Sequence, residues 1–389
     1  MKKVPFFLYG FQESDLGGIA DVIAGHSSFG KDRKIAFDRI PNYVEMLEKQ
    51  AIEITKAQYA IAVNSQISAT LLALQALEIK RNHRVICSVY CHPFVPECIR
   101  YFDAEPVFVD VDPVTLTMLP DKCEELLLKK DQERIKAIIV SHIGGTPTEM
   151  EPFYELKEKY KVGLIEEASF AVGVKYKNGD YVGSNSRSDF TIVSHFLGGK
   201  TKLFNAGMLL TNNEEKAKKC ISLRYHSQVR GNNNYGLFYD IVDMSLDHTM
   251  SMLSAKLALL LTDKLEAHKE RRAKIAEMYR EGLKGINGLS LPEKNKDDIH
   301  TLFIIRLKKS RDKISSLLYE AGVETSLHFI PINLLSYYKN KFQLKVMQFP
   351  NAFQAYQEVL SLPLYAGMSD EDVQYVIVTL KEILAQELA

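Results

Sequence analysis

The segment between Ser194 and Gly207 holds the residues most able to do chemistry. After the strand-like run 190–193 it carries one serine, two glycines and two lysines, Lys200 and Lys202, within nine residues. A lysine amine can form an imine with an aldehyde and then move protons, and a serine hydroxyl among backbone N–H groups can hold a phosphate. Whether a lysine does so here depends on the elements that position the segment.

The composition bounds the class of protein. Of the 389 residues, 46% are apolar and 25% are charged, which is ordinary for a globular chain with a substantial core. Basic and acidic residues each number 49, so the net charge of zero favours neither nucleic acid nor an anionic membrane as a partner. No apolar run suits a signal peptide or a membrane span, so we expect a soluble, cytoplasmic protein.

The cysteines indicate neither a disulfide framework nor a metal site. There are five, an odd number, at Cys87, Cys91, Cys98, Cys123 and Cys220. The first three lack a C-x-x-C pair and fall on a predicted strand and the helix after it. We therefore interpret them as reduced, buried small residues and expect no metal.

Nearly continuous apolar runs alternate with helical patterns in the first half of the chain. The strand-like runs are 59–63, 84–87, 106–110, 135–140, 163–166 and 190–193, with helical patterns at 69–77, 95–102 and 150–159. Buried strands separated by helices predict an α/β fold with a mostly parallel sheet that helices cover. Ligands of such sheets bind beyond the carboxyl ends of the strands.

The second half of the chain predicts a smaller α/β domain. A long helical pattern covers 250–283, and we interpret its charged part, 264–274, as a solvated face. Further patterns predict a strand at 301–307, a helix at 311–321, a strand at 324–328 and a last helix at 370–388. We place the boundary in the long helix. This gives a large domain at 1–254, with an N-terminal arm, and a small C-terminal domain at 255–389.

Four motifs, taken in order, carry a family resemblance. They are the strand and acidic turn at 105–112, V-S-H-I-G-G-T-P at 140–147 followed by Met150, T-S-L-H-F-I-P at 325–331, and L-S-L-P-L-Y at 360–365. Together they resemble the DegT/DnrJ/EryC1/StrS family of pyridoxal-phosphate (PLP)-dependent sugar aminotransferases. The resemblance covers almost the whole chain and implies the aspartate-aminotransferase fold, fold type I, whose large domain has a mostly parallel, seven-stranded type of sheet.

The resemblance also implies partners and a role. Such proteins are homodimers with PLP at the subunit interface, and most transfer an amino group from glutamate to a keto sugar attached to a nucleotide. The implied role is amino-group transfer to a nucleotide-linked sugar in surface polysaccharide or amino-sugar biosynthesis, with His328 in the substrate-side loop. A few members dehydrate the sugar instead and have a histidine in place of the lysine.

One set of positions aligns with the phosphate site of the family. Ser65, Gln66 and Ile67 stand where the family has S-G-T. Glycine lets the backbone approach a phosphate and threonine adds a donor, and Gln66 and Ile67 supply neither in the same way, although the helix N-terminus can still attract an anion. An ordinary strand-to-helix turn explains these residues equally well. The resemblance implies Ser194 as a further phosphate ligand.

Other positions align with contacts to the cofactor ring and to the partner's phosphate. Glu167 keeps the carboxylate that holds the pyridine nitrogen protonated, and Phe170 replaces a glutamine that bonds the ring oxygen. His92 aligns with the ring-stacking aromatic residue, although a surface histidine explains it equally. Asp247 aligns with an asparagine that reaches the neighbouring subunit's phosphate, where two negative charges ~4 Å apart would repel by roughly 1 kcal/mol in water.

The register of the lysine can be counted from both sides. Five residues on from Ser194 lies Gly199, and counting back from the glycine-rich return at 205–207 gives Gly199 again, so the resemblance places the family's lysine there, one residue before Lys200. Lys200 is the candidate for the imine and Lys202 a weaker one, but two solvated loop lysines are the simpler interpretation. His195, four positions before the lysine site, is the candidate for dehydratase-like chemistry.

Two hypotheses follow from these departures. In the first, the protein is a sugar aminotransferase in which Lys200 bonds PLP. In the second, it is a non-catalytic homologue that binds a sugar nucleotide or an active paralogue, because the departures gather on the cofactor pocket while the motifs that shape the fold survive.

Overall fold

A seven-stranded sheet forms the centre of the part of the chain that the structure describes. The structure is a computed structural model and describes residues 2–25, 41–129, 132–194, 203–230, 239–293 and 301–387. In sequence order the strands are β1 (Tyr59–Val63), β2 (Arg84–Ser88), β3 (Glu105–Val109), β4 (Ile135–Ser141), β5 (Gly163–Glu167), β6 (Phe190–Ser194) and β7 (Gly207–Thr211). Their spatial order is β1-β7-β6-β5-β4-β2-β3, and only β7 runs antiparallel to its neighbours. The predicted α/β fold class and all six predicted strands are confirmed.

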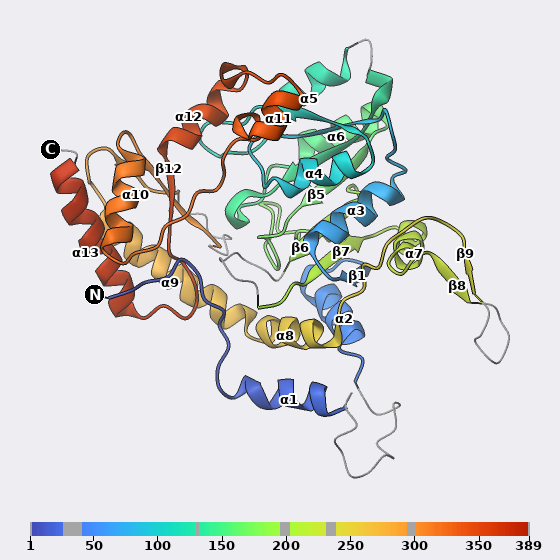
Figure 1. The fold of residues 1–389 in the computed structure, drawn as a ribbon, viewed down its shortest axis with the longest axis horizontal. Helices are drawn as coiled ribbons and strands as arrows, with labels where there is room; N and C mark the ends of the chain where they lie inside the picture. Colours follow the sequence, from blue (N-terminus) through green and yellow to red (C-terminus); the bar gives the residue numbers. More distant parts are fainter. Residues whose placement is uncertain are drawn as a thin grey trace.

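Helices cover this sheet and build the second half of the chain (Figure 1). The α-helices are α1 (Asp15–Gly25), α2 (Tyr43–Thr55), α3 (Gln66–Ala76), α4 (Phe94–Tyr101), α5 (Pro120–Leu127), α6 (Glu151–Tyr160), α7 (Glu214–Leu223), α8 (Met252–Asp263), α9 (Leu265–Leu283), α10 (Arg311–Glu320), α11 (Ser336–Lys341), α12 (Pro350–Glu358) and α13 (Asp370–Glu387). Short 3-10 turns lie at Gln132–Arg134, Ile143–Gly145, Ile332–Leu334 and Val346–Gln348.

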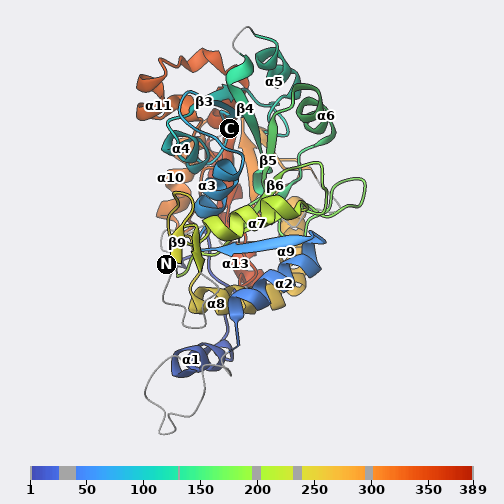
Figure 2. The same cartoon turned by 90° about the vertical axis from the view of Figure 1, so that its right-hand side faces the viewer.

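Alternation along β1 shows how both faces of the sheet are buried. Ile61 and Val63 pack in one apolar core with α3, whereas Ala60 and Ala62 pack in another with α2 and α8. Successive side chains of a strand point to opposite faces, so one short strand serves two cores. Figure 2 shows α2 and α8 on the side of β1 opposite to α3 and α7.

A further core lies in the second half of the chain. It is formed by α9, α10, α13 and a three-stranded antiparallel sheet of β10 (Leu289–Ser290), β11 (Phe303–Leu307) and β12 (Val359–Leu362). The helices α8 and α9 run beneath both halves of the molecule in Figure 1. The predicted helix at 250–283 is therefore two helices, because Lys264 leaves helical geometry at φ −97° and ψ 7°.

Two other sequence predictions were wrong in part. The third strand of the small sheet is β12 rather than 324–328, because this segment makes only isolated bridges, such as that of Ser326 with Ser361, before turning toward Tyr90. The charged stretch 264–274 is not a solvated face throughout. Arg272 is only 5% exposed, because its position on α9 follows the buried side of the helix with Ile275 and Tyr279.

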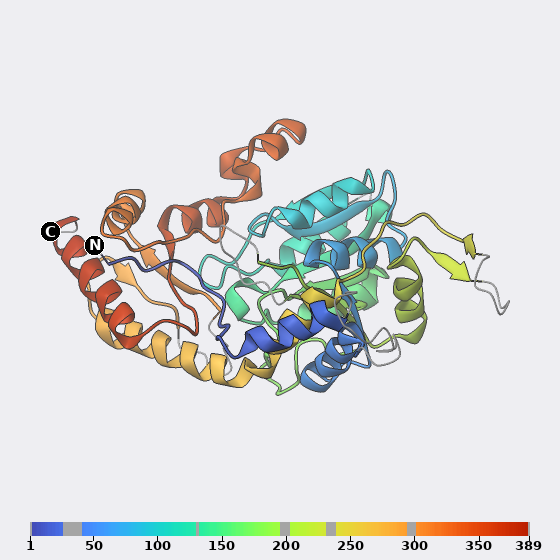
Figure 3. The same cartoon turned by 60° about the horizontal axis from the view of Figure 1, so that its bottom comes forward.

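The N-terminal arm connects the two halves of the molecule. Val4 bridges with Val323, and its backbone exchanges hydrogen bonds with Gly322 and Glu324. The arm then crosses to α1, as Figure 3 shows. A hairpin of β8 (Gln228–Arg230) and β9 (Tyr239–Ile241) projects from the other end of the molecule. No helix in the described ranges is long and apolar enough to cross a membrane.

The start of β7 leaves no room for a side chain, which gives a test of the packing. A Cβ atom at Gly207 would lie 2.2 Å from the carbonyl carbon of Ser65 and 2.6 Å from the amide nitrogen of Gln66. We predict that Gly207→Ala lowers the free energy of unfolding by about 1–3 kcal/mol, because backbone atoms must shift. Urea unfolding followed by circular dichroism measures this. The control is Gly17→Ala, where a Cβ meets nothing within 4 Å; equal stability of both variants would contradict the packing argument.

Candidate functional site

Polar residues gather at the carboxyl edge of the central sheet. In the register of β4 and β5, Ser141 is paired with Glu167, and the next strand, β6, ends at Ser194. Because these strands are parallel neighbours, their carboxyl ends meet at one edge, where ligands of open α/β sheets bind. The structure therefore brings the predicted residues Glu167 and Ser194 to the same edge.

Glu167 is a buried carboxyl group, and few contacts stabilise its ionised form. Its side chain is 3% exposed and accepts a hydrogen bond from the Ser169 amide at 3.1 Å. Burial raises the pKa of Glu167, and the contacts from Ser169 and His142 offset this only in part. Such a group favours a cationic partner, because a nearby positive charge would stabilise its ionised form.

The preceding residue, Glu166, has the opposite environment. Its carboxylate accepts hydrogen bonds from His142 Nε2 at 2.9 Å, from Tyr154 at 3.2 Å, and from the hydroxyls of Tyr176 and Ser188. Burial alone would raise the pKa of Glu166, but these donors together outweigh it and lower the pKa. Glu166 is therefore a satisfied structural carboxylate.

The tautomer of His142 follows from its two contacts. The Thr148 amide donates to His142 Nδ1 at 2.9 Å, so the ring proton lies on Nε2 and is donated to Glu166. His142 thus joins β4 to β5 from beneath the site. Sequence reasoning used His142 only as part of the motif at 140–147 and missed this pair, for which the adjacent glutamates at 166 and 167 were the available signal.

The predicted phosphate residues lie together at the start of α3. Ser65 caps the helix, and its Oγ accepts from the Ser68 amide at 3.2 Å. The Gln66 Oε1 accepts from Ser194 Oγ at 3.3 Å, and Ile67 is 40% exposed. The positive end of the helix therefore lies beside Ser194, as an anion site requires, but the Gln66 side chain spans the space between them.

Asp247 lies beside this helix start within its own chain. The carbonyl of Asp247 accepts from Asn64 Nδ2 at 3.5 Å, and the neighbouring His248 bonds Ser68 Oγ at 2.9 Å. Hydrogen bonds from the Thr249 side chain and amide lower the pKa of Asp247, so a negative charge stands near α3. A contact of Asp247 with a partner subunit stays a prediction.

His92 and His328 belong to one aromatic cluster. Both rings contact Phe329, with ring centroids 5.6 and 5.1 Å away. Burial, helped by the nearby His92, lowers the pKa of His328 to about 4, so His328 is neutral at physiological pH. Its Nδ1 pairs with Ser361 Oγ at 2.9 Å, and Tyr90 donates to its carbonyl oxygen. His92 is exposed, and its stacking on a cofactor ring stays a prediction.

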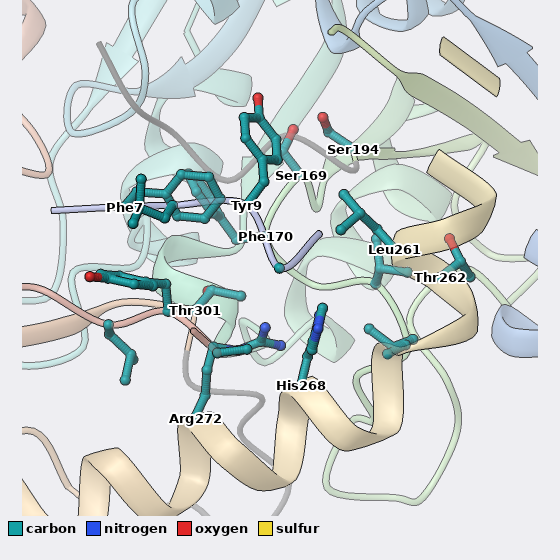
Figure 4. Close-up of a pocket in the computed structure, with 17 residues that line it drawn as sticks. Phe7, Tyr9, Ser169, Phe170, Ser194, Leu261, Thr262, His268, Arg272 and Thr301 are labelled. Atoms are coloured by element: carbon teal, nitrogen blue, oxygen red, sulfur yellow. The ribbon is translucent and has the colours of Figure 1, made fainter. Parts of the chain in front are cut away.

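A pocket opens next to this edge of the sheet (Figure 4). It has about 730 Å³ of empty space, a figure that includes open solvent, and the predicted residues Phe170 and Ser194 are among its lining residues. Its other walls come mainly from the arm, from the end of α8, from α9 and from the segment 364–366, none of which sequence reasoning assigned to a site. Glu167, His92, Asp247 and His328 are not among the lining residues.

The candidate for the imine cannot be placed. Lys200 lies outside the described residues, as do Gly199, Lys202 and His195. Their assignment continues to rest on the count from Ser194.

Comparisons with known proteins agree on one family. The model of the family described as the DegT/DnrJ/EryC1/StrS aminotransferase family matches residues 36–381. An uncharacterized protein of Methanocaldococcus jannaschii, MJ1066, is 32% identical over 342 residues, which are 85% of this chain and 87% of that protein. The spore coat polysaccharide biosynthesis protein SpsC of Bacillus subtilis is 31% identical over 354 residues, which are 88% and 89% of the two chains.

A solved structure agrees on the fold. NtdA from Bacillus subtilis, solved with bound cofactor PMP, superimposes with a TM-score of 0.84 at 24% identity and covers 99% of this chain and 86% of that one.

The two neighbouring glutamates should respond to pH in opposite ways in the protein without ligands. The lowered pKa of Glu166 means that its stabilising effect is present near neutral pH and is lost in acid. The raised pKa of Glu167 means that its ionisation destabilises the fold as pH rises. We predict that Glu166→Gln lowers the free energy of unfolding by about 1–3 kcal/mol at pH 8 and by less near pH 4, below the ordinary glutamate pKa of 4.5. Glu167→Gln should become more stable relative to the wild type as the pH rises from the lower to the higher of these two values.

Urea unfolding of both variants and the wild type at each pH checks this. A parallel change of both variants with pH would contradict the assignment of opposite environments.

Proposed function

The chain belongs to the DegT/DnrJ/EryC1/StrS aminotransferase family, and from this premise we propose that it is a PLP-dependent aminotransferase that acts on nucleotide-linked sugars. The observation that carries the proposal is Glu167, a buried carboxyl group with a raised pKa at the carboxyl end of β5. The similarity to SpsC supports a role in polysaccharide or amino-sugar biosynthesis.

The residues present fit the ring of this cofactor. A protonated pyridine nitrogen would give Glu167 the cationic partner that its burial favours. The Ser169 hydroxyl is buried without a hydrogen-bond partner of acceptable geometry among the described residues, so a polar group can still be accommodated there. When bound, PLP would supply the electron sink for amino-group transfer.

The phosphate end fits after one side-chain rotation. Among the described residues the Gln66 side chain bonds only the Ser194 hydroxyl, through a long contact of 3.3 Å, and this hydroxyl also lies 3.0 Å from the carbonyl oxygen of Ala206. Turning Gln66 away would leave the Ser194 hydroxyl, still held by Ala206, facing the positive end of α3. Ser65 would keep the helix start in place through its cap. Lys200 would form the covalent bond and move the proton, a role that rests on the sequence.

A second candidate function is a non-catalytic homologue that binds a sugar nucleotide or an active paralogue. Two observations favour it. The Gln66 side chain occupies the space between α3 and Ser194, and the ionised Asp247 adds a negative charge near the same helix start. Each would weaken phosphate binding, and the count of residues places Gly199 at the lysine position.

We further propose that the protein is a homodimer. Large apolar side chains are exposed on α1 and on the β8–β9 hairpin, among them Leu16, Ile23, Val229, Tyr239 and Ile241. Grouped exposed apolar residues on a soluble domain usually mark an interface. The hairpin also projects from the body of the molecule, where it can reach another subunit (Figure 3).

The dimer can be tested by light scattering after size exclusion. We expect a mass of twice 44.2 kDa for the wild type and a shift toward monomer for Ile241→Asp, because a carboxylate would be buried in the interface. The matched control is Val114→Asp, which changes an exposed valine away from α1 and the hairpin. A wild-type monomer at micromolar concentration would overturn the proposal.

Lys200 can be tested directly with the cofactor. Incubation with PLP should give an absorbance near roughly 410–430 nm, and borohydride reduction followed by peptide mapping should place the label on Lys200. Lys200→Ala should lose the label, whereas the nearby control Lys202→Ala should keep it. No absorbance and no label at millimolar PLP would exclude the enzyme and favour the non-catalytic homologue.

A further inference from the structure

A second hollow lies at the amino edge of the central sheet, opposite to the edge at which β5 ends with Glu167 and β6 with Ser194. Its walls are the turn before β2, the 3-10 turn before β4, and one residue of β4 itself. The two turns meet because β2 and β4 are parallel neighbours, with Arg84 paired with Ile135 in their register. The lining residues are Arg81, Asn82, His83, Glu133, Arg134 and Lys136.

Hydrogen bonds hold the two turns against each other and against the sheet. Arg134 donates from Nε to the carbonyl oxygen of Asn82 at 2.9 Å. The His83 amide donates to the carbonyl oxygen of Lys80 at 3.0 Å, which closes the first turn. The carbonyl oxygen of His83 accepts from the amide of Glu105, the first residue of β3, at 2.9 Å. The side chains that line the hollow therefore stand on backbone that the sheet positions.

Positive charge is in excess in the hollow. Three of the described lining side chains are cationic, and one, Glu133, is a carboxylate. The Arg134 guanidinium already has a carboxylate near it, that of Glu105 at 3.8 Å. Arg81 and Lys136 are exposed and form no ion pair with a described residue, and Lys136 is the only exposed residue of β4. The hollow thus offers two cationic side chains with which an anion can pair.

His83 adds a group that responds to an anion. Its Nδ1 is buried and has no hydrogen-bond partner among the described residues. Burial lowers the pKa of His83, and the nearby Lys136 and Lys80 lower it further. From the 3-10 turn, Arg134 and Glu133 line the same hollow with charges of opposite sign. The ring is therefore neutral near pH 7, and an anion in the hollow would favour its protonated form, because a negative charge opposes the effect of the lysines.

We propose that this hollow binds the dianionic phosphate group of a small molecule, with the Arg81 guanidinium and the Lys136 ammonium as charged donors and His83 beside them. A guanidinium matches two phosphate oxygens with parallel N–H donors, and an ammonium pairs with a third as a point charge. One dianion balances both cations, whereas the single charge of a carboxylate leaves one of them unmatched. The site stands without the proposed function, because it uses no residue of the cofactor pocket.

NMR spectra of the histidine rings test the site in the full chain without an activity assay. The protein, isotope-labelled in its histidine rings, is titrated at low ionic strength with inorganic phosphate, glycerol 3-phosphate or acetate, and the His83 signal is identified by its loss in His83→Gln. We expect phosphate to shift this signal saturably, with a Kd on the order of 1 mM, and to raise the pKa of His83. Acetate should shift it far more weakly at the same ionic strength.

Three results would overturn the proposal. They are a His83 signal that does not move with phosphate, an equal shift with acetate, and phosphate binding by calorimetry that leaves the His83 signal in place, which would put the anion at the cofactor site. The two phosphates distinguish the sources of the ligand. Tighter binding of glycerol 3-phosphate would identify a phosphate ester, and equal binding would identify the free anion.

Matched variants show whether the charges of the hollow carry the binding. Lys136→Gln should weaken phosphate binding about 2- to 5-fold, as expected for an exposed pair, and adding Arg81→Gln should weaken it to about 10-fold in all. The control is Lys122→Gln, which removes an exposed lysine paired with Glu125 on α5 and should leave the affinity unchanged. Full affinity in the Arg81→Gln and Lys136→Gln double variant, or equal weakening by Lys136→Gln and the control, would contradict a specific site.

Discussion

Two adjacent carboxyl groups are buried at the end of β5, and the rest of the site depends on how differently their ionised forms are stabilised. Strand alternation points Glu166 and Glu167 to opposite faces of the sheet. Glu166 receives donors from His142 and three hydroxyls, which together make its buried charge stable. The contacts of Glu167, chiefly from Ser169, do not outweigh the effect of burial, so a cationic ligand would favour its ionised form. A buried carboxyl group of this kind, at the carboxyl edge of the sheet where ligands bind, suits a positively charged ring.

The scaffold around this pair is rigid where the chemistry requires it. His142 joins β4 to β5, and the close contact of Gly207 with Ser65 fixes the start of α3 beside the end of β6. The departures predicted from the family resemblance include Gln66 and Phe170, which the structure places at the start of α3 and in the pocket of Figure 4. The architecture of the family is kept, whereas a changed phosphate end and a changed lysine register are predictions from the sequence. The two hypotheses therefore rest on different residues. Glu167 and Lys200 support the enzyme, whereas Gln66, Asp247 and Gly199 support the non-catalytic homologue.

The sequence predicted the central sheet well because buried parallel strands are nearly continuous apolar runs. It failed where tertiary packing overrides local pattern. The helix break at Lys264 has neither glycine nor proline to mark it, and the stretch 324–328 has strand-like residues but turns toward Tyr90. The pocket was missed because Arg272 stands in a charged stretch typical of a solvated face, and because the approach of Gly10 to His268 joins residues far apart in the chain. Ser65, Gln66, Glu167 and Ser194 were singled out through the family resemblance, and each lies within three residues of the end of a predicted strand.

The central claim is that Glu167 is the partner of a cofactor ring nitrogen. A crystal structure of the protein grown with PLP tests it most directly. The account predicts the pyridine nitrogen within hydrogen-bonding distance of a Glu167 carboxylate oxygen and the Gln66 side chain turned away from Ser194. A structure at saturating PLP in which Gln66 still bonds Ser194 and no ring lies against Glu167 would contradict it.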